Sequence, residues 1–194
     1  RLVGALSAFI MPSRGLASVP AIPILKDASL LRHQAFVNGN WVHAREPSAT
    51  VDVCDPATGA VIGSIPDMGQ AETRQAIDAA AASFPAWRGK LASERGAILR
   101  RWFDLIVENR DDLAAIMTAE CGKPLAESLG EITYAASFVE WYAEEAKHTY
   151  GDVIPTSAHG RRLLVSKQPI GVVGAITRRP PRPALAPPCP CPAP

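Results

Sequence analysis

The composition of the chain changes abruptly near its C-terminal end, and this change constrains the fold more than any other feature. Residues 170–177 (IGVVGAIT) form an unalternating, β-branched-rich apolar run, typical of a strand covered on both faces in a parallel sheet. Residues 178–194 contain eight prolines. Because proline fixes φ and lacks an N–H donor, this tail cannot form the helix that a parallel strand needs next. We therefore predict the beginning of a parallel sheet, followed by a disordered tail.

Size and charge limit the class of function. The 194 residues, 47% of them apolar, are enough for one domain or for a large part of a bigger one. Twenty basic residues balance 19 acidic ones, so charge gives no reason to expect nucleic acid or an anionic membrane as a partner. The apolar run is shorter than the roughly 20 residues of a membrane-spanning helix. We expect a small-molecule substrate, with no nucleic acid and no membrane as partner.

Residues 1–30 have the composition of a targeting segment. The stretch from Arg1 to Lys26 contains no Asp or Glu, basic and Ser residues are scattered along it, and Leu2 and Leu6 share a helical face with other apolar side chains. This pattern predicts a mitochondrial transit peptide and a location in the mitochondrial matrix; the alternative is a flexible tail on a cytoplasmic protein. Because the sequence begins with arginine, we expect further residues to precede it. The whole segment is left out of the expected fold.

Short antiparallel strands are expected around turn residues. Asn38-Gly39 lies between strand-like runs and predicts a two-residue hairpin turn. Residues 51–54 and 60–65 predict a second hairpin around the turn sequence DPATG. Residues 162–167 resemble an exposed strand.

Helical periodicity fills the middle of the chain. The pattern predicts a helix over residues 71–83 that ends near Pro85, a second with Ser93 as N-cap, a third that ends at Gly122, and a long one over residues 125–150. Helices that precede a doubly covered strand indicate an α/β fold.

An ordered series of motifs then resembles the N-terminal portion of NAD(P)-dependent aldehyde dehydrogenases. The series covers residues 31–177 and consists of DPATG (55–59), PDMG (66–69), ER (94–95), LRRW (99–102), ECGKPL (120–125), GEI (130–132) and KQPIGV (167–172). Within that superfamily, FVEWYAEEAKHTYGDVIP (138–155) is most similar to succinate-semialdehyde dehydrogenases.

The resemblance implies an incomplete enzyme fold. Residues 31–150 correspond to the N-terminal half of a Rossmann-like cofactor domain, 151–169 to strands of a bridge that builds homo-oligomers, and 170–177 to the first core strand of the cofactor sheet. Residues 178–194 have no counterpart in the family. The implied activity is oxidation of succinate semialdehyde to succinate in 4-aminobutyrate breakdown, with NAD or NADP as cofactor.

The chemistry of this reaction requires groups that the chain lacks. An aldehyde becomes a hydride donor after a thiolate adds to it, and the reaction further needs oxyanion donors and a carboxylate that activates water. The family supplies these with a Cys, a Glu and the Asn of a Pro-Trp-Asn motif, whereas here Ile176-Thr177 is followed by Arg178. We assign no catalytic residue and predict that the chain alone is inactive. Ile176 and Thr177 are the expected cofactor contacts.

The remaining candidate residues are interpreted as structural. Cys121 is expected at a helix C-terminus, where the dipole disfavours a thiolate, and Cys54 precedes a turn. Cys189 and Cys191 lack further ligands at suitable spacing, and the four histidines show no mutual spacing, so no metal site is expected. Lys123 is explained as a cation near a helix C-terminus.

Two interpretations of the tail stay open. A shifted reading frame or another sequence error would explain why the family pattern stops at Thr177. Alternatively the chain is a non-catalytic, truncated isoform that acts by associating with subunits, or through a tail that resembles proline-rich ligands of aromatic grooves.

Overall fold

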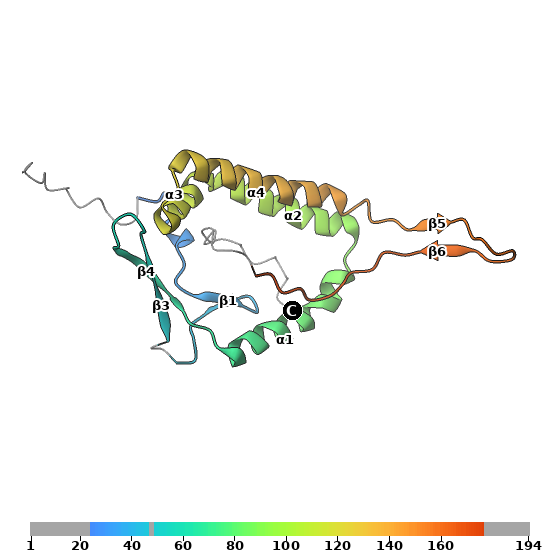
Figure 1. Cartoon of the computed structure of the whole chain (residues 1–194), viewed down its shortest axis with the longest axis horizontal. Coiled ribbons are helices and arrows are strands. Elements are labelled where there is room, and N and C mark those ends of the chain that lie inside the picture. Colours follow the sequence, from blue (N-terminus) through green and yellow to red (C-terminus); the bar gives the residue numbers. More distant parts are fainter. Residues whose placement is uncertain (1–23, 47–48, 177–194) are drawn as a thin grey trace, which may run out of the picture.

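The computed structural model describes residues 24–46 and 49–176. Figure 1 shows a group of packed helices (residues 92–145), here called the body, a further helix (residues 70–88) apart from it, two small hairpins, and a third hairpin that projects away. The elements in chain order are a 3₁₀ helix η1 (Ala28–Leu30), β1 (Ala35–Val37), β2 (Asn40–Val42), β3 (Thr50–Cys54), β4 (Val61–Pro66), α1 (Gln70–Arg88), α2 (Ala92–Glu108), α3 (Arg110–Cys121), α4 (Leu125–Glu145), β5 (Asp152–Ile154) and β6 (Leu163–Val165). The predictions for residues 1–23 and 177–194 lie outside the described residues.

The first two hairpins confirm the turn predictions. Asn38 and Gly39 have φ values of 50° and 78°, the left-handed pair that a two-residue turn requires. In the β1–β2 pair, Phe36 faces Trp41 and their rings meet edge to face with centroids 5.1 Å apart. β3 pairs antiparallel with β4 around the predicted DPATG turn. Local turn chemistry therefore sets this part of the fold.

The DPATG turn is held by the side chain of its aspartate. The carboxylate of Asp55 accepts hydrogen bonds from the N–H of Ala57 at 2.8 Å and from the hydroxyl of Thr58 at 2.9 Å. The Ala57 bond, followed by the Thr58 bond, lowers the pKa of Asp55. Gly59 adopts φ 74° and closes the turn.

α1 continues past the predicted stop at Pro85 and ends at Arg88. Proline removes one helical N–H, but Pro85 is exposed, and the N–H of Gly89 still reaches the carbonyl of Pro85 at 3.1 Å. The predicted end was wrong because Pro85 lacks only its own N–H, while its carbonyl still accepts a hydrogen bond and closes one more helical turn.

α2 begins before the predicted N-cap. Ser93 lies inside the first turn, and Leu91 occupies the N-cap position. The carboxylate of Glu94 accepts the N–H of Leu91 at 2.7 Å and so satisfies a backbone donor at the helix start. The Ser93 prediction was wrong because this glutamate, rather than a serine, supplies the capping group.

The core lies between α2, α3 and α4. Leu113, Ala114 and Met117 of α3 pack against Ile132 of α4, and all four are almost fully buried. α2 and α4 lie side by side (Figure 1), and a Cβ on Gly96 would come within 2.7 Å of the carbonyl oxygen of Ala143. A residue without a side chain is therefore required at this crossing.

The ends of α3 and α4 follow from local hydrogen bonding. Gly122 has φ 70° and ends α3 at the predicted place. α4 ends at Glu145, before the predicted end at Tyr150. The N–H groups of Lys147 and His148 bond back to the carbonyls of Glu144 and Glu145, which tightens the last turn and closes the helix.

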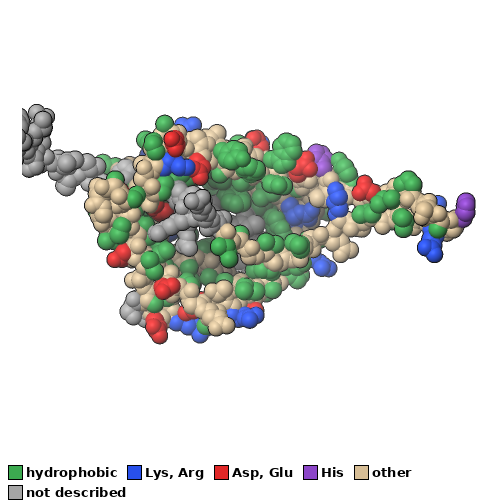
Figure 2. Space-filling model, in the orientation of Figure 1, with side chains coloured by type: hydrophobic (Ala, Val, Ile, Leu, Met, Phe, Trp, Pro, Cys, Tyr) green, Lys and Arg blue, Asp and Glu red, His purple; other side chains and the backbone are tan. Residues whose placement is uncertain are grey.

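The β5–β6 hairpin forms an arm. Its strands confirm the predicted exposed strand near residues 162–167, and β5 pairs with β6 in an antiparallel ladder. Every strand residue is exposed, and Figures 1 and 2 show the arm, with its apolar side chains, projecting from the body.

The expected strand over residues 170–177 differs from the structure. No strand is assigned to residues 170–176, and the three ladders among the described residues are all antiparallel two-stranded pairs. A parallel strand forms only against a neighbouring strand, and the described part of the chain offers none to this segment. Apolar composition alone did not determine the local structure here.

Residues 24–30 also depart from the expectation that the whole segment 1–30 stays outside the fold. This stretch contains η1, and its backbone bonds to the start of α3. None of the helices in the described part of the chain is long and apolar enough to cross a membrane.

Candidate functional site

The predicted cofactor segment lies exposed after the arm. The side chains of Ile170 and Ile176 are 91% and 102% exposed. Gly171 has φ 106°, a value that a side chain at this position would strain. Thr177 lies outside the described residues. The cofactor contacts assigned to Ile176 and Thr177 therefore stay predictions.

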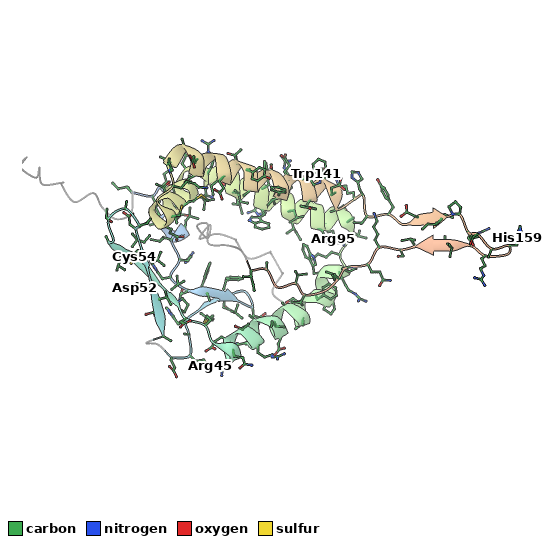
Figure 3. All side chains as sticks on the ribbon, viewed as in Figure 1. Arg45, Asp52, Cys54, Arg95, Trp141 and His159 are labelled. Atoms are coloured by element: carbon green, nitrogen blue, oxygen red, sulfur yellow. The ribbon has the colours of Figure 1, made fainter. Side chains whose placement is uncertain are left out.

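The thiol of Cys54 does not form a nucleophile–base pair with His159. Cys54 ends β3 and is exposed, whereas His159 lies at the tip of the arm, at the opposite end of the molecule (Figure 3). Cys121 is the last residue of α3 and packs, partly buried, against the core cluster. This packing agrees with the structural role expected for Cys121. Cys189 and Cys191 lie outside the described residues.

The histidines are dispersed over the molecule. His33 lies against Gly63 of β4, His43 shares a 2.8 Å hydrogen bond with Gln34, and His148 is on the loop after α4. Among the described residues, no three His, Cys, Asp or Glu side chains gather in a way that could hold a metal ion.

Lys123 has a different role from the one expected. Its ammonium group forms an ion pair with the carboxylate of Glu131 on α4, and both side chains are about one-third exposed. The hydrogen bond to Glu131 is the main cause that raises the pKa of Lys123. The pair links the loop after α3 to α4, so Lys123 joins two elements, while Gly122 provides the helix cap.

A groove with an apolar lining lies between α2 and α4. Its volume is about 210 Å³, and its lining includes Phe103, Ile106, Val107, Ile132, Ala136 and Glu140. Pockets for cofactors and drug-sized ligands usually enclose roughly 300–1,000 Å³. The groove is therefore too small to hold a dinucleotide.

Sequence reasoning missed Asp112, the most conspicuous buried charged residue of the described chain. Asp112 is 6% exposed and accepts the backbone N–H groups of Lys26 at 3.0 Å and Asp27 at 2.8 Å. An acidic pair in the first turn of α3 was visible in the sequence, but such residues are common at helix N-termini. Nothing local indicated a partner in a segment so distant along the chain.

Comparison with known proteins identifies the family. The model of the aldehyde dehydrogenase family matches residues 41–178. The chain is 61% identical over 153 residues to glutarate-semialdehyde dehydrogenase of Pseudomonas putida, covering 79% of this chain and 32% of that protein. It is 57% identical over 153 residues to the NADP(+) succinate-semialdehyde dehydrogenase of Escherichia coli, with the same coverage. The mitochondrial succinate-semialdehyde dehydrogenase of Mus musculus is 49% identical over 166 residues, with coverage of 86% and 31%.

The fold agrees with a solved relative. The structure of succinate-semialdehyde dehydrogenase from Burkholderia pseudomallei superposes with a TM-score of 0.72 at 58% identity, over 76% of this chain and 30% of that one. The chain spans about a third of the length of the curated relatives that it matches. The resemblance inferred from the motifs is confirmed. The chain belongs to the aldehyde dehydrogenase family, and its described residues form part of that family's α/β fold.

Proposed function

We propose that this chain contributes the N-terminal part of an NAD(P)-dependent enzyme that oxidises succinate semialdehyde to succinate. The observation that carries the proposal is the identity of 57% and 61% over 153 residues to enzymes named for succinate and glutarate semialdehyde. Both aldehydes carry a carboxylate at the far end, so the proposed substrate class is a short aldehyde with a terminal carboxylate.

The residues present provide a scaffold and no reacting group. The exposed backbone near Ile176 does not by itself enclose a dinucleotide, and the groove between α2 and α4 is too small for one. When bound, the nicotinamide would accept the hydride. We assign Ile176 and Thr177 to one edge of that site and no catalytic role to Cys54 or Cys121. The chain alone is therefore expected not to turn over aldehyde.

The proposed domain roles follow the resemblance. We assign residues 31–150 to the N-terminal half of the cofactor domain, 151–169 to the oligomer bridge, and 170–177 to a segment that would form the first core strand once a neighbouring strand is present. The exposed apolar side chains of the arm support the bridge, since a homo-oligomer would cover them.

The proposed location is the mitochondrial matrix. The acid-free N-terminal composition and the mitochondrial mouse relative support it. The alternative is the cytoplasm.

A chimera tests the proposed function. The corresponding N-terminal third of the E. coli relative is replaced by residues 24–176 of this chain, and kcat/KM is measured with succinate and glutarate semialdehyde. We expect values within about tenfold of the parent enzyme, a difference of about 1.4 kcal/mol in transition-state stabilisation. A correctly assembled chimera that binds NADP but oxidises neither semialdehyde would contradict the proposal.

The isolated chain provides the second measurement. Purified chain 1–194 is incubated with succinate semialdehyde and either NAD or NADP. We expect no NAD(P)H above the background without protein. Aldehyde-dependent NAD(P)H production that persists after repurification would disprove the assignment of no catalytic residue.

A second candidate function is association without catalysis. It is favoured by the arm, where the side chains of Val153 and Leu164 are 70% and 72% exposed. The isoform would then bind intact subunits through this surface. We expect co-purification with full-length subunits that the substitution Leu164→Asp abolishes, and its persistence in the variant would exclude the arm as the contact.

A further inference from the structure

The segment of residues 26–31, here named the strap, is fixed to the start of α3 by one buried carboxylate. The N–H of Lys26 donates to Oδ1 of Asp112 at 3.0 Å, and the N–H of Asp27 donates to Oδ2 at 2.8 Å. Two adjacent backbone donors on the two oxygens of one carboxylate hold the strap against the start of α3.

The two hydrogen bonds to Asp112 are here called the clamp. The strap makes further hydrogen bonds on the C-terminal side of the clamp. The carboxylate of Asp27 accepts the N–H of Ser29 at 2.9 Å and caps η1, and the N–H of Leu31 bonds to the carbonyl of Ala28 at 3.3 Å. The Ser29 bond is the main cause that lowers the pKa of Asp27. The chain then continues into β1. The clamp is therefore the first of several contacts that join this segment to the fold.

The strap also stabilises the buried carboxylate of Asp112. A carboxylate that is 6% exposed is costly unless hydrogen-bond donors replace water. The free N–H groups at the start of α3 provide a favourable field, but the two hydrogen bonds to its oxygens described above come from the strap. Asp111, the neighbouring acid, is exposed and meets the side chains of Lys26 and Arg110. The two acids thus form a natural comparison.

We infer that Lys26 belongs to the folded unit, so that a proteolytically removed leader ends no later than the bond between Leu25 and Lys26. Hydrolysis of that bond adds water and leaves a carboxylate on Leu25 and an ammonium group on Lys26. The new ammonium would still donate to Asp112, as a stronger, charge-assisted bond. Hydrolysis after Lys26 removes one of the two donors.

The boundary is independent of the proposed location. Only its connection to a leader rests on the proposed mitochondrial import, and the boundary itself rests on the contacts of Asp112. It also moves the expected end of the removable segment from residue 30 to residue 25. Ile24 is 98% exposed, whereas Leu25, Leu30 and Leu31 are half-buried.

Native-state proteolysis of the full chain tests the boundary. The chain 1–194 is digested with a broad-specificity protease under native conditions, and the N-terminus of the stable product is determined by mass spectrometry. We expect the stable product to begin at or before Lys26. A wild-type product that begins beyond Lys26 would overturn the inference, whatever the enzyme's activity or location.

Two matched pairs of variants isolate the clamp. Asp112→Asn replaces the clamping carboxylate, and Asp111→Asn removes the same charge from the same helical turn. We expect cleavage between residues 26 and 31 to become at least about tenfold faster in Asp112→Asn and to change less than about twofold in Asp111→Asn. Equal rates in these two variants would refute the role of Asp112.

The second pair leaves α3 untouched, so it remains informative if Asp112→Asn fails to fold. Lys26→Pro removes the backbone donor, whereas Lys26→Ala keeps it and removes the side chain beyond Cβ, including the ammonium group. We expect faster strap cleavage in Lys26→Pro alone, with the rate of cleavage in the exposed β5–β6 arm unchanged. Equal protection of the strap in both variants would contradict the inference.

Discussion

The helical body and the β5–β6 arm both carry apolar side chains but differ in how far they bury them. In the body, Leu113 and Ile116 are 3% and 1% exposed, whereas in the arm Val153 and Leu164 are 70% and 72% exposed. The body has three helices that cover one another. The arm is a single pair of short strands, which is too small to bury either of its faces.

The difference teaches that apolar content and core formation are separate properties. A strand or helix buries its apolar side only when another element covers it. α2, α3 and α4 provide this cover for each other within the described residues. The most exposed residues of the arm, Val153 and Leu164, are therefore expected to add little to the stability of the body.

The largest expected difference in the free energy of unfolding is between a side-chain truncation in the body and one in the arm. Ile116→Ala removes a fully buried side chain and should lower the free energy of unfolding by about 2–5 kcal/mol. Leu164→Ala in the arm should change it by less than about 0.5 kcal/mol. Urea denaturation followed by far-UV circular dichroism measures both. Similar losses in the two variants would remove the distinction between body and arm.

Within the body, one glycine lies at a crowded helix crossing and another lies in open space. A Cβ on Gly96 would lie 2.7 Å from the carbonyl oxygen of Ala143, whereas one on Gly130 would meet nothing within 4 Å. We expect Gly96→Ala to destabilise by about 1–3 kcal/mol through overpacking. Gly130→Ala should stabilise by up to about 1 kcal/mol through helix propensity. Thermal unfolding measures both variants. A change in stability of the same sign in the two variants would contradict the prediction.

A smaller effect is expected from a buried polar contact. The hydroxyl oxygens of Thr118 and Ser128 lie 2.9 Å apart between α3 and α4, and Ser128 is fully buried. Ser128→Ala should cost about 1–2 kcal/mol, because it leaves the Thr118 hydroxyl without this partner. The exposed Ser137→Ala on α4 is the control and should change stability by less than about 0.5 kcal/mol. Equal costs would show that burial does not strengthen the contact.

The smallest effect concerns the pH dependence of the β3–β4 turn. The pKa of Asp55 is lowered from 3.8 in the folded chain, so its hydrogen bonds stabilise the fold above that pH and are lost as pH falls through the folded pKa. The stability difference between wild type and Asp55→Asn should be constant above about pH 5 and shrink below about pH 4. Urea titrations at several pH values measure this stability difference. A difference that grows as the pH falls would contradict a lowered pKa for Asp55.

Local signals made much of the fold predictable. Asn38-Gly39 and DPATG specify their own turns, and Gly122 marks the end of α3, because each depends on residues that are neighbours in sequence. The errors at Pro85 and Ser93 arose because proline often ends a helix and serine often caps one, but here both residues lie inside a helix. They moved helix ends without changing the number or order of the helices.

Contacts between distant residues could not be predicted. Residues 170–176 have the composition of a core strand, but a strand also needs a neighbour, and sequence pattern does not report whether one is present. The clamp by Asp112 and the ion pair of Lys123 with Glu131 depend on how separate elements meet. Ile176 and Thr177 were assigned through resemblance, and their contact with a cofactor stays a prediction.

The long separation between Lys26 and Asp112 has a consequence for synthesis. The two residues are 86 positions apart. At about 5–20 residues per second, a ribosome makes Asp112 roughly 4–17 s after Lys26. During that interval the strap has been made but its binding partner has not. The same segment that is fixed in the finished fold is thus available to other factors while the chain is still growing.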